Sequence, residues 1–196
     1  MKQYERNFQN PLPDRFYQGT TQDIAQNLLG KGLVVSKPDG TLLAVQITEV
    51  EAYLSKNDPA SHSHRGPTHR NQTMFERAGT CYIYLSYGIH YCVNVVTQKK
   101  GVGEAILIRS AVPLLGLEIM QKNRNVKSLK TLLNGPGKVT QAMGIDLHFN
   151  GMRFDGKIRI IDLDQRDFSI GCSPRIGISK AKDLQLRYFI KAGHGS

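Results

Sequence analysis

Residues 49–71 read EVEAYLSKNDPASHSHRGPTHRN, and residues 79–95 read GTCYIYLSYGIHYCVNV. These two stretches carry four of the six histidines and five of the eight tyrosines of the chain. Alternating apolar residues lead directly into Glu49 and Glu51, which places this acidic pair at the end of a strand. The second stretch predicts a hairpin around Tyr87 and Gly88. So many titratable and polar aromatic side chains exceed what a core needs, and they indicate a functional site.

The composition of the whole chain limits what this site can belong to. With 196 residues, of which 40% are hydrophobic, the chain is long enough for one domain with its own core. Its three cysteines, Cys81, Cys92 and Cys172, form no CxxC pair, which favours a reducing cytoplasm over an oxidising compartment. No apolar run approaches the roughly 20 residues of a membrane-spanning helix, and the polar start lacks the apolar core of a secretion signal. We therefore expect a soluble protein with no membrane contact.

The net charge is the strongest bulk property of the chain. The 26 Lys and Arg residues outnumber 16 Asp and Glu residues, which gives a net charge of +10 and a pI near 9.6. Such an excess attracts polyanions and favours phosphate contacts. The basic residues form no block of five or six, so we expect a folded basic face and no disordered basic tail. Charge alone makes nucleic acid only a somewhat favoured partner.

Hydrophobic periodicity predicts both helices and strands outside the central stretch. A short amphipathic helix is expected after Thr20 or Thr21, with Gly30 at its end. A second helix is expected from Pro113, with Leu114, Leu117 and Met120 on one face, and a third in residues 135–144. Residues 55–79 are expected to form a loop that lines the site, because loops of this length are often functional. The predicted strands are residues 32–37, 41–54, 81–86, 90–96, 103–112, 157–163, 175–179 and 187–191, with 103–112 in the centre of the sheet.

Glu49 and Glu51 point to the same face of the predicted strand and stand just before the long loop. A solvated strand edge is the commoner meaning of such a pair. Beside Tyr53 and the loop histidines, however, a carboxylate can act as a general base on a water molecule when partial burial tunes its pKa. The sequence therefore favours an acid–base site over a plain edge.

Two other catalytic classes are weaker. His62, His64 and His69 suggest a metal site that a carboxylate would complete, but their spacing matches no strong metal signature. We therefore expect no metal. A cysteine hydrolase built on Cys92 and His90 lacks a third group to orient the histidine. Cys92 is better explained as core packing.

The tyrosines of the hairpin separate into two kinds. Tyr82 and Tyr84 share a strand face, where an ordinary aromatic ladder is the simplest interpretation. Tyr87 stands at the expected tip, in solvent. An exposed aromatic side chain on a basic domain suits a wedge that enters a base stack. Pocket aromatics that stack on an extruded base would complete such a site.

Several segments in the same order resemble the alkyladenine (3-methyladenine) DNA glycosylase family, in its short bacterial form. They are EVEAYLSKNDPASHSHRG, RNQTMF, GTCYIYLSYGIHYCVNVV, AILIRSAVPLLGLEIM and LLNGPGKVTQAMGI. The resemblance implies a single mixed α+β domain, with a curved antiparallel sheet flanked by short helices, similar to the C-terminal domain of methionyl-tRNA formyltransferase. We accordingly divide the chain into an N-terminal arm, residues 1–19, and one glycosylase domain, residues 20–196.

The resemblance also implies catalytic roles for single residues. Glu51 resembles the general base that activates the water attacking the sugar C1′, whereas Glu49 matches a position without that role. Arg109 resembles the arginine that helps to hold this water beside the phosphate. The carbonyl of Ile176 is expected to be a further acceptor for the water.

The same resemblance assigns the base pocket. Tyr53 and His62 are expected to form one wall and Tyr84 the opposite wall, with the flipped purine between them. Tyr87 would take the place of that purine in the duplex. Asn94 resembles the asparagine that disfavours guanine by crowding its exocyclic amine.

The expected activity is therefore hydrolysis of the N-glycosidic bond of 3-methyladenine, hypoxanthine or ethenoadenine in double-stranded DNA, as a step of base excision repair. An N-alkylated purine already carries positive charge and departs readily, so one carboxylate and a positioned water suffice. No lysine lies in the matched pocket motifs, so we expect neither a Schiff base nor strand cleavage, and no cofactor. We expect a monomer in the bacterial cytoplasm, associated with the nucleoid. The alternatives are a non-catalytic damaged-DNA-binding module and a metal-dependent hydrolase.

The register of the hairpin conflicts with this pocket. A two-residue loop at Tyr87 and Gly88 would pair Tyr84 with Tyr91 and would place Tyr84 and Asn94 on opposite faces. Both side chains could not then line one pocket. A bulge or a longer loop would remove the conflict.

Overall fold

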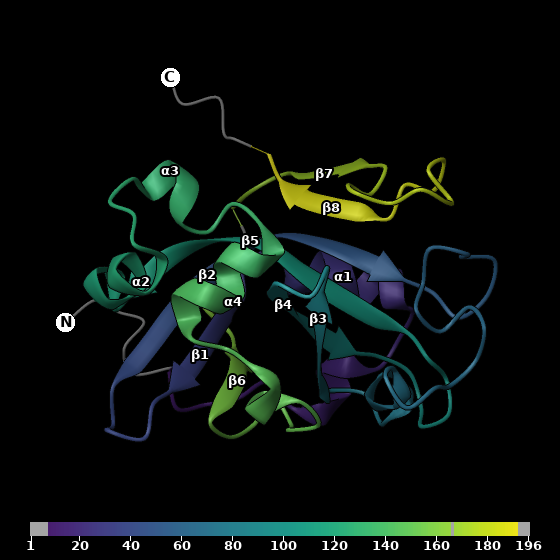
Figure 1. The fold of residues 1–196 in the computed structure, drawn as a ribbon, viewed down its shortest axis with the longest axis horizontal. Helices are drawn as coiled ribbons and strands as arrows, with labels where there is room; N and C mark the ends of the chain where they lie inside the picture. Colours follow the sequence, from purple (N-terminus) through teal and green to yellow (C-terminus); the bar gives the residue numbers. More distant parts are fainter. Residues whose placement is uncertain (1–7, 166, 192–196) are drawn as a thin grey trace.

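The computed structural model describes residues 8–165 and 167–191, and in this part of the chain eight antiparallel strands curl into a half-barrel with short helices packed on it (Figure 1). The strands are β1 (Gly32–Ser36), β2 (Leu42–Tyr53), β3 (Cys81–Ser86), β4 (His90–Val96), β5 (Ala105–Leu115), β6 (Ile158–Ile161), β7 (Ile170–Ser173) and β8 (Arg187–Ile190). The α-helices are α1 (Thr21–Leu28), α2 (Leu117–Arg124), α3 (Leu129–Leu132) and α4 (Pro136–Met143). Three 3-10 helices are Asp14–Tyr17, Gln72–Phe75 and Leu147–Phe149. The predicted single mixed α+β domain with a curved antiparallel sheet is confirmed at this level, and the likeness to the formyltransferase domain stays a prediction.

Strand β2 organises the sheet, whose order is β3-β4-β5-β2-β1-β6. One edge of β2 pairs with β5 over most of its length. The other edge is shared, since β1 pairs with residues 42–46 and β8 pairs with residues 49–51. In Figure 1, β7 and β8 accordingly lie as a two-stranded ribbon along the top of the sheet. The end of β2 that carries Glu49 and Glu51 is therefore enclosed by strands from two distant parts of the sequence.

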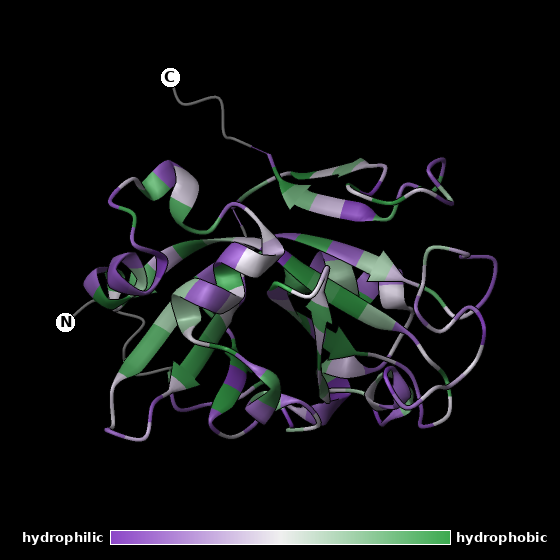
Figure 2. Ribbon diagram, viewed as in Figure 1, coloured by the Kyte–Doolittle hydropathy of each residue, from purple (hydrophilic) through white to green (hydrophobic). Residues whose placement is uncertain are grey.

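The core lies between this curled sheet and helices α1 and α4. Ile24 and Leu28 of α1 and Val139 and Met143 of α4 are buried in one apolar cluster with the inner faces of the strands. Figure 2 shows the strands largely in the colour of hydrophobic residues and the connecting loops in that of hydrophilic ones. Burying each such side chain contributes about 1.5–3 kcal/mol. This packing provides a rigid frame for the polar groups at the end of β2.

Most of the predicted elements are present. The first helix begins after Thr20, whose hydroxyl accepts a hydrogen bond from the Asp23 N–H, and Gly30 follows its end at φ +79°. Strand β5 lies between β4 and β2, so its predicted central position is confirmed. Residues 55–79 contain only the short 3-10 helix 72–75 between strands β2 and β3. No helix of the described residues is long and apolar enough to cross a membrane.

The helix predicted from Pro113 is wrong at its start. Strand β5 continues through Pro113 to Leu115, and α2 begins only at Leu117, after Gly116 in the left-handed region at φ +85°. Pro113 lies opposite Val45, next to an irregularity of the β2–β5 register. A proline is tolerated in a strand at such a place, because its missing N–H interrupts no regular ladder. The apolar spacing continued across the strand–helix boundary and hid it.

The strand predicted at residues 175–179 is also wrong. These residues form bends, and the strand of this region is β7, which pairs with β8 and which the sequence pattern missed. Arg175 is buried, and the N–H of Ile176 donates to a carboxylate of β2 instead of to a neighbouring strand. Gly177, at φ +75°, turns the chain away. These contacts with distant residues override the local alternation.

The structure decides the length of the hairpin loop, which the sequence left open. The loop between β3 and β4 has three residues, Tyr87, Gly88 and Ile89, with Tyr87 at φ +50° and Gly88 at φ +70°. Tyr84 therefore pairs with Cys92, and Tyr82 with Asn94. Directly opposite residues, and residues two positions along, share a face of the sheet. The three-residue loop thus places both tyrosines and Asn94 on one side and removes the conflict.

The described part of the N-terminal arm packs on the sheet. Phe8 is buried in a small apolar cluster with Val34 and Ile161, and Pro11 forms a bridge to Ile161. Tyr17 is also buried. Residues 1–7 of the arm lie outside the described residues, and the boundary at residue 19 stays a prediction.

Candidate active site

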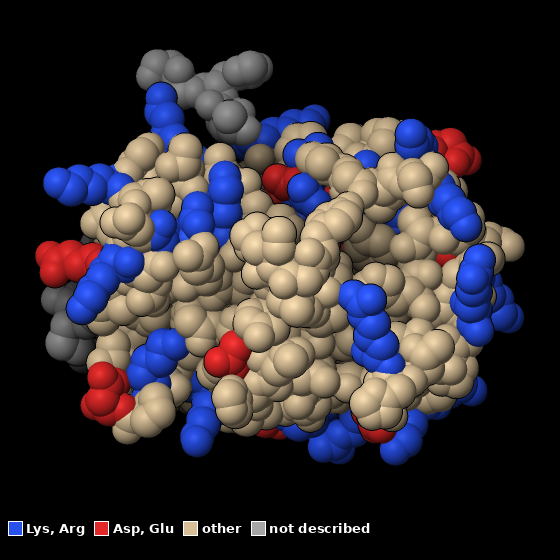
Figure 3. Space-filling model, viewed as in Figure 1, with Lys and Arg blue, Asp and Glu red and all other residues tan. Residues whose placement is uncertain are grey.

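A cleft of about 740 Å³ lies beside the C-terminal half of β2. Seven of the eight predicted site residues line it, and Glu51 is buried directly behind three of them. Arg70 and Lys180 are also in the lining, and Figure 3 shows many Lys and Arg side chains and few Asp and Glu on the face in view. The predicted residues in the lining are Tyr53, His62, Tyr84, Tyr87, Asn94, Arg109 and Ile176. The fold therefore brings together residues that are up to 123 positions apart in the sequence, as the numbering of Tyr53 and Ile176 shows.

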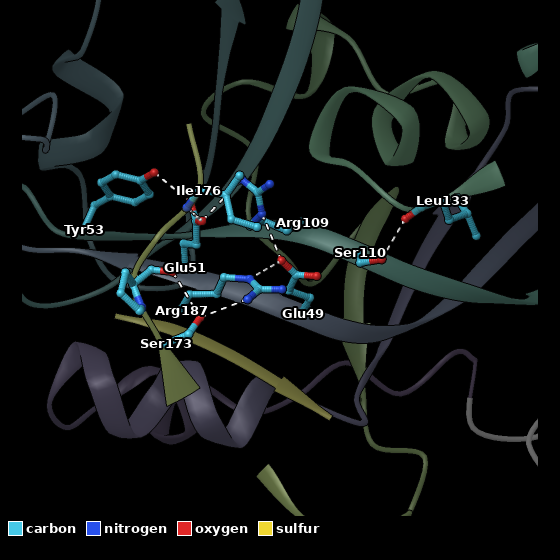
Figure 4. A network of polar contacts seen from close by, with 10 residues as sticks. Glu49, Glu51, Tyr53, Arg109, Ser110, Leu133, Ser173, Ile176 and Arg187 are labelled. Carbon is cyan, nitrogen blue, oxygen red and sulfur yellow. Dashed lines mark hydrogen bonds and ion pairs between the residues drawn. The ribbon is translucent and has the colours of Figure 1, made fainter. Parts of the chain in front are cut away.

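Glu51 has no exposed surface, and three groups hold its carboxylate (Figure 4). The N–H of Ile176 donates to Oε1 at 2.7 Å, and Nη1 of Arg109 lies 3.3 Å from the same oxygen. The hydroxyl of Tyr53 donates to Oε2 at 2.8 Å. Buried carboxylates need partners of this kind, because the desolvation of an unpaired charge is costly. Glu51 is thus fixed in one orientation at the wall of the cleft.

Arg109 connects the two glutamates of β2. Its Nε donates to Glu49 Oε1 at 3.1 Å while its Nη1 faces Glu51. The register of β2 against β5 shifts on both sides of Glu49, so the ladder is irregular beside Arg109. Arg187 of β8 also donates to Glu49 Oε1, at 2.6 Å, and is held in turn by the hydroxyl of Ser173 at 2.9 Å. Glu49 therefore holds Arg109 in place, a contact that the sequence did not indicate.

The rings of the cleft are grouped differently from the predicted walls. His62 lies edge-on to Tyr84, with 4.5 Å between ring centroids and an interplanar angle of 77°, and leaves no room for a base between these two rings. Nδ1 of His62 lies 3.0 Å from the hydroxyl of Tyr82, and this contact holds the imidazole beside Tyr82 and Tyr84. His62 as a whole is exposed, but the edge of its ring that packs against these tyrosines is desolvated. This local burial lowers the pKa of His62, and the positive charge of Arg70 lowers it further. The structure thus puts His62 with Tyr84 and not with Tyr53.

Asn94 and Tyr87 complete the lining. Asn94 is buried, and its amide nitrogen donates to the carbonyls of Tyr82 at 3.0 Å and Cys92 at 3.3 Å. Tyr87 is 85% exposed at the tip of the hairpin, where no core contact accounts for an aromatic side chain. The backbone around Tyr87 is in the left-handed region, which projects the tip from the sheet.

The loop histidines do not converge. His64 lies in a second, smaller cavity of about 270 Å³ together with Arg65 and Arg70, and His62 borders both cavities. Among residues 8–165 and 167–191, no three His, Cys, Asp or Glu side chains come close enough to hold a metal ion.

Burial changes the acid–base properties of the cleft tyrosines. It raises the pKa of Tyr82 to about 12 and raises the pKa values of Tyr53 and Tyr84 further. The carboxylate of Glu51 adds to the effect on Tyr53, and Cys92 adds to the effect on Tyr84. All three hydroxyls therefore stay protonated at neutral pH, and Tyr53 remains a hydrogen-bond donor to Glu51.

These raised pKa values make the free energy of unfolding depend on pH in the alkaline range. Unfolded tyrosines lose their protons near pH 10, whereas the folded protein retains them, so the unfolded state binds fewer protons above pH 10. We expect the free energy of unfolding to fall as pH rises through 10 and above. Tyr84→Phe removes one of these groups, so urea unfolding between pH 8 and 11.5 is expected to show a shallower fall than in the wild type. Parallel curves for the two proteins would contradict this account of Tyr84.

Sequence reasoning missed several polar residues of the site. Asp58 and Arg175 form a buried ion pair behind Tyr53, and Arg187 binds Glu49. Tyr82 orients His62, although it was assigned only to an aromatic ladder. Arg175 and Arg187 each stand in a short, otherwise apolar segment, RIGI and RYFI. A charged residue in such a segment is a signal for a buried partner, but it does not identify the partner.

Comparison with known proteins gives a consistent family assignment. Residues 15–194 match the family model described as methylpurine-DNA glycosylase (MPG). A protein of Methanoculleus marisnigri is 44% identical over 92% of this chain and 95% of its own length. A protein of Francisella tularensis subsp. tularensis is 48% identical, with 87% and 90% covered, and one of Chlorobium phaeobacteroides is 42% identical, with 91% of each chain covered. All three carry the name "Putative 3-methyladenine DNA glycosylase". The chain belongs to the methylpurine-DNA glycosylase family and is a hydrolase that acts on N-glycosyl bonds.

Proposed function

We propose that this protein is a monofunctional DNA glycosylase of base excision repair, which flips alkylated or deaminated purines out of duplex DNA and hydrolyses their N-glycosidic bond. The lesions are of the 3-methyladenine, hypoxanthine and ethenoadenine class. The observation that carries the proposal is a buried carboxylate, Glu51, held by Arg109 at the wall of an aromatic cleft. A protein that only bound damaged DNA would need the aromatic cleft but not this carboxylate–arginine pair.

Glu51 acts as the general base in this proposal. A carboxylate has about four lone-pair positions, and the structure uses two on Oε1 and one on Oε2. The position left on Oε2 accepts a hydrogen bond from the attacking water. The water oxygen bonds to C1′ as its proton passes to Glu51, and the electrons of the broken C1′–N bond leave with the base. A cationic alkylated purine departs without further protonation, so one carboxylate is sufficient for it, whereas a neutral base such as hypoxanthine takes up a proton from water as it leaves.

Arg109 and Ile176 position this water. Nη2 of Arg109 has no partner among the described residues, and Arg109 lines the cleft. This group is therefore available to a DNA phosphate or to the water. Ile176 donates its N–H to Glu51, and we propose its carbonyl as a second acceptor for the water.

The base stacks between Tyr53 on one side and the contacting pair His62 and Tyr84 on the other. This arrangement follows from the 4.5 Å contact within the pair, which excludes a base between them. Asn94, on the same face of the hairpin as Tyr84, closes the pocket and crowds the exocyclic amine of guanine. Selectivity against normal guanine thus rests on exclusion.

Lys180 is the one feature of the cleft lining that bears on a Schiff-base mechanism. It is exposed at the edge of the cleft, whereas a lysine that forms a Schiff base needs desolvation or a neighbouring cation to lose its proton. We therefore expect no covalent adduct with DNA on borohydride treatment and no strand cleavage. A trapped adduct that disappears in Lys180→Ala would overturn the monofunctional assignment.

The test of the proposed function is single-turnover release of base from duplexes that contain 3-methyladenine, hypoxanthine or ethenoadenine, measured both without and with a chelator. We expect release of the free base and an abasic strand that breaks only after alkali. Release that stops on chelation would instead support a metal-dependent hydrolase. Tight binding of the lesion duplex without any release would support the binding module.

The exposed ring of Tyr87 is expected to fill the gap left by the flipped base. Stacking of an aromatic ring on a base contributes about 1–3 kcal/mol, so Tyr87→Ala should weaken binding to a lesion duplex by about 5- to 160-fold. Leu129→Ala is a matched control, because Leu129 is an exposed apolar residue of α3 outside the cleft lining. Fluorescence anisotropy at fixed salt compares the two variants. Equal affinities for Tyr87→Ala and the wild type would remove the wedge role.

A further inference from the structure

Arg175 and Asp58 form an ion pair with no exposed side-chain surface, next to the cleft but outside the predicted catalytic set. The guanidinium meets the carboxylate in a two-pronged contact, Nη1 to Oδ2 at 2.7 Å and Nη2 to Oδ1 at 2.6 Å. Asp58 also accepts from the N–H of Leu54 at 2.9 Å and of Ala60 at 3.2 Å. The pair therefore ties the start of the long loop to the segment after β7.

Stability alone does not explain such a pair. Removing two charges from water costs about as much as their attraction returns, and apolar replacements of similar volume are often neutral or stabilising. Nε of Arg175 moreover has no hydrogen-bond partner in the structure, which adds a desolvation cost. An arrangement that gains little stability suggests a role in fixing neighbouring groups.

The neighbours of Arg175 are two of the groups that hold Glu51. Its guanidinium carbon lies 4.5 Å from the centre of the Tyr53 ring, and its Nη1 donates to the carbonyl of Ala52 at 2.9 Å. The next residue along the chain is Ile176, whose N–H donates to Glu51. Figure 4 shows Tyr53 and Ile176 both directed at the carboxylate of Glu51. One buried guanidinium thus contacts the Tyr53 ring and anchors the backbone that supplies the Ile176 N–H.

We propose that Arg175, held by Asp58, is a positioning residue of the active site. It supports the Tyr53 ring that forms one wall of the base pocket, and it fixes the backbone at Ile176, so that two of the three groups on Glu51 stay in place. The planar fork of arginine is needed, because one face packs on the ring while the edge binds Asp58 and the Ala52 carbonyl. This inference rests on the proposed function of Glu51.

The first test is Arg175→Lys, which retains the charge and the pairing with Asp58 but loses the fork. Misplacement of a catalytic group by about 1 Å costs on the order of 10²-fold, so we expect single-turnover base release to slow by about that factor. Arg159→Lys is the matched control, because Arg159 is also buried, with partners Phe8, Ser36 and Gly156, and does not line the cleft. It should retain the wild-type rate constant in its folded state. An equal loss in both variants would show a general effect of stability and would overturn the proposal.

A double-mutant cycle separates positioning from stability. In the background of Glu51→Gln, Arg175→Lys should reduce the residual release much less than it does in the wild type, because the group that it positions is already inactive. A general loss of stability would act equally in both backgrounds. Equal factors in the two backgrounds would therefore overturn the proposal.

A second variant separates loss of positioning from misfolding. Asp58→Asn combined with Arg175→Met removes both charges, keeps an acceptor for the Leu54 N–H, and should leave the melting temperature near that of the wild type. We expect this variant to fold and to release base as slowly as Arg175→Lys. A folded double variant with the wild-type rate constant would overturn the inference while leaving the proposed function intact. Absence of release by the wild type itself would instead overturn the proposed function.

Discussion

Glu51→Gln is expected to slow single-turnover release of 3-methyladenine by about 10²–10⁴-fold, the usual contribution of a positioned general base. Glutamine retains the shape of glutamate and a carbonyl oxygen for the Ile176 N–H, and the Tyr53 hydroxyl can accept from its amide nitrogen. What it cannot do is take a proton from water. The measurement is the rate constant with enzyme in excess over duplex. Samples are quenched at successive times, and the abasic product is then cleaved with alkali.

Two comparisons test whether the result is specific to the role of Glu51 as general base. The affinity of Glu51→Gln for lesion duplex should stay close to that of the wild type, because Glu51 is buried behind the cleft wall and does not line it. Glu49→Gln is the matched control, since Glu49 binds the same arginine but lacks the contacts with Tyr53 and Ile176. A loss in Glu49→Gln as large as in Glu51→Gln would mean that the charge of the network, and not Glu51 itself, carries the reaction.

The sequence predicts the part of this site that lies on regular strands. Glu51, Arg109, Tyr84 and Asn94 all stand on strands that the sequence predicts, so their neighbourhood follows once the sheet order is known. Even there, one residue in the loop length decides the outcome. A two-residue loop would separate Tyr84 from Asn94, whereas the observed three-residue loop unites them. Local signals do not distinguish these loops. Tyr87 adopts a positive φ, a backbone conformation that the sequence would suggest only at a glycine.

The supporting contacts are not predictable in the same way. Arg175 meets Asp58 across 117 positions, and Arg187 meets Glu49 across 138. Such pairs leave no periodic pattern in the sequence, and a charged residue in an apolar segment signals a buried partner without identifying it. The irregular segment around Ile176 was predicted as a strand for the same reason, since its apolar spacing is visible and its contact with Glu51 is not. The pattern of the core is therefore local information, while the polar network behind the cleft depends on the completed fold.

Arg109→Lys is expected to cause the second largest loss of activity, about 10²–10³-fold in single-turnover base release, the usual effect of removing one positioned donor. A lysine has one ammonium group and cannot bind Glu49 through one nitrogen and Glu51 through another while presenting a third to the cleft. The charge stays, so attraction of DNA to the basic face should change little. The measurement is the rate constant at saturating enzyme, with thermal denaturation to confirm folding.

Arg187→Lys provides the matched comparison for Arg109. The Arg187 side chain binds the same oxygen of Glu49, at 2.6 Å; its backbone lies opposite Glu51 in the β2–β8 ladder, but its guanidinium forms no ion pair with the Glu51 carboxylate. If the network acted only by neutralising the two carboxylates, the two substitutions would have similar effects, since both keep the charge. If Arg109 also supplies the donor that faces the water and the phosphate, Arg109→Lys must lose far more than Arg187→Lys. Similar losses would place Arg109 among the supporting charges and leave Glu51 to position its water with Tyr53 and Ile176 alone.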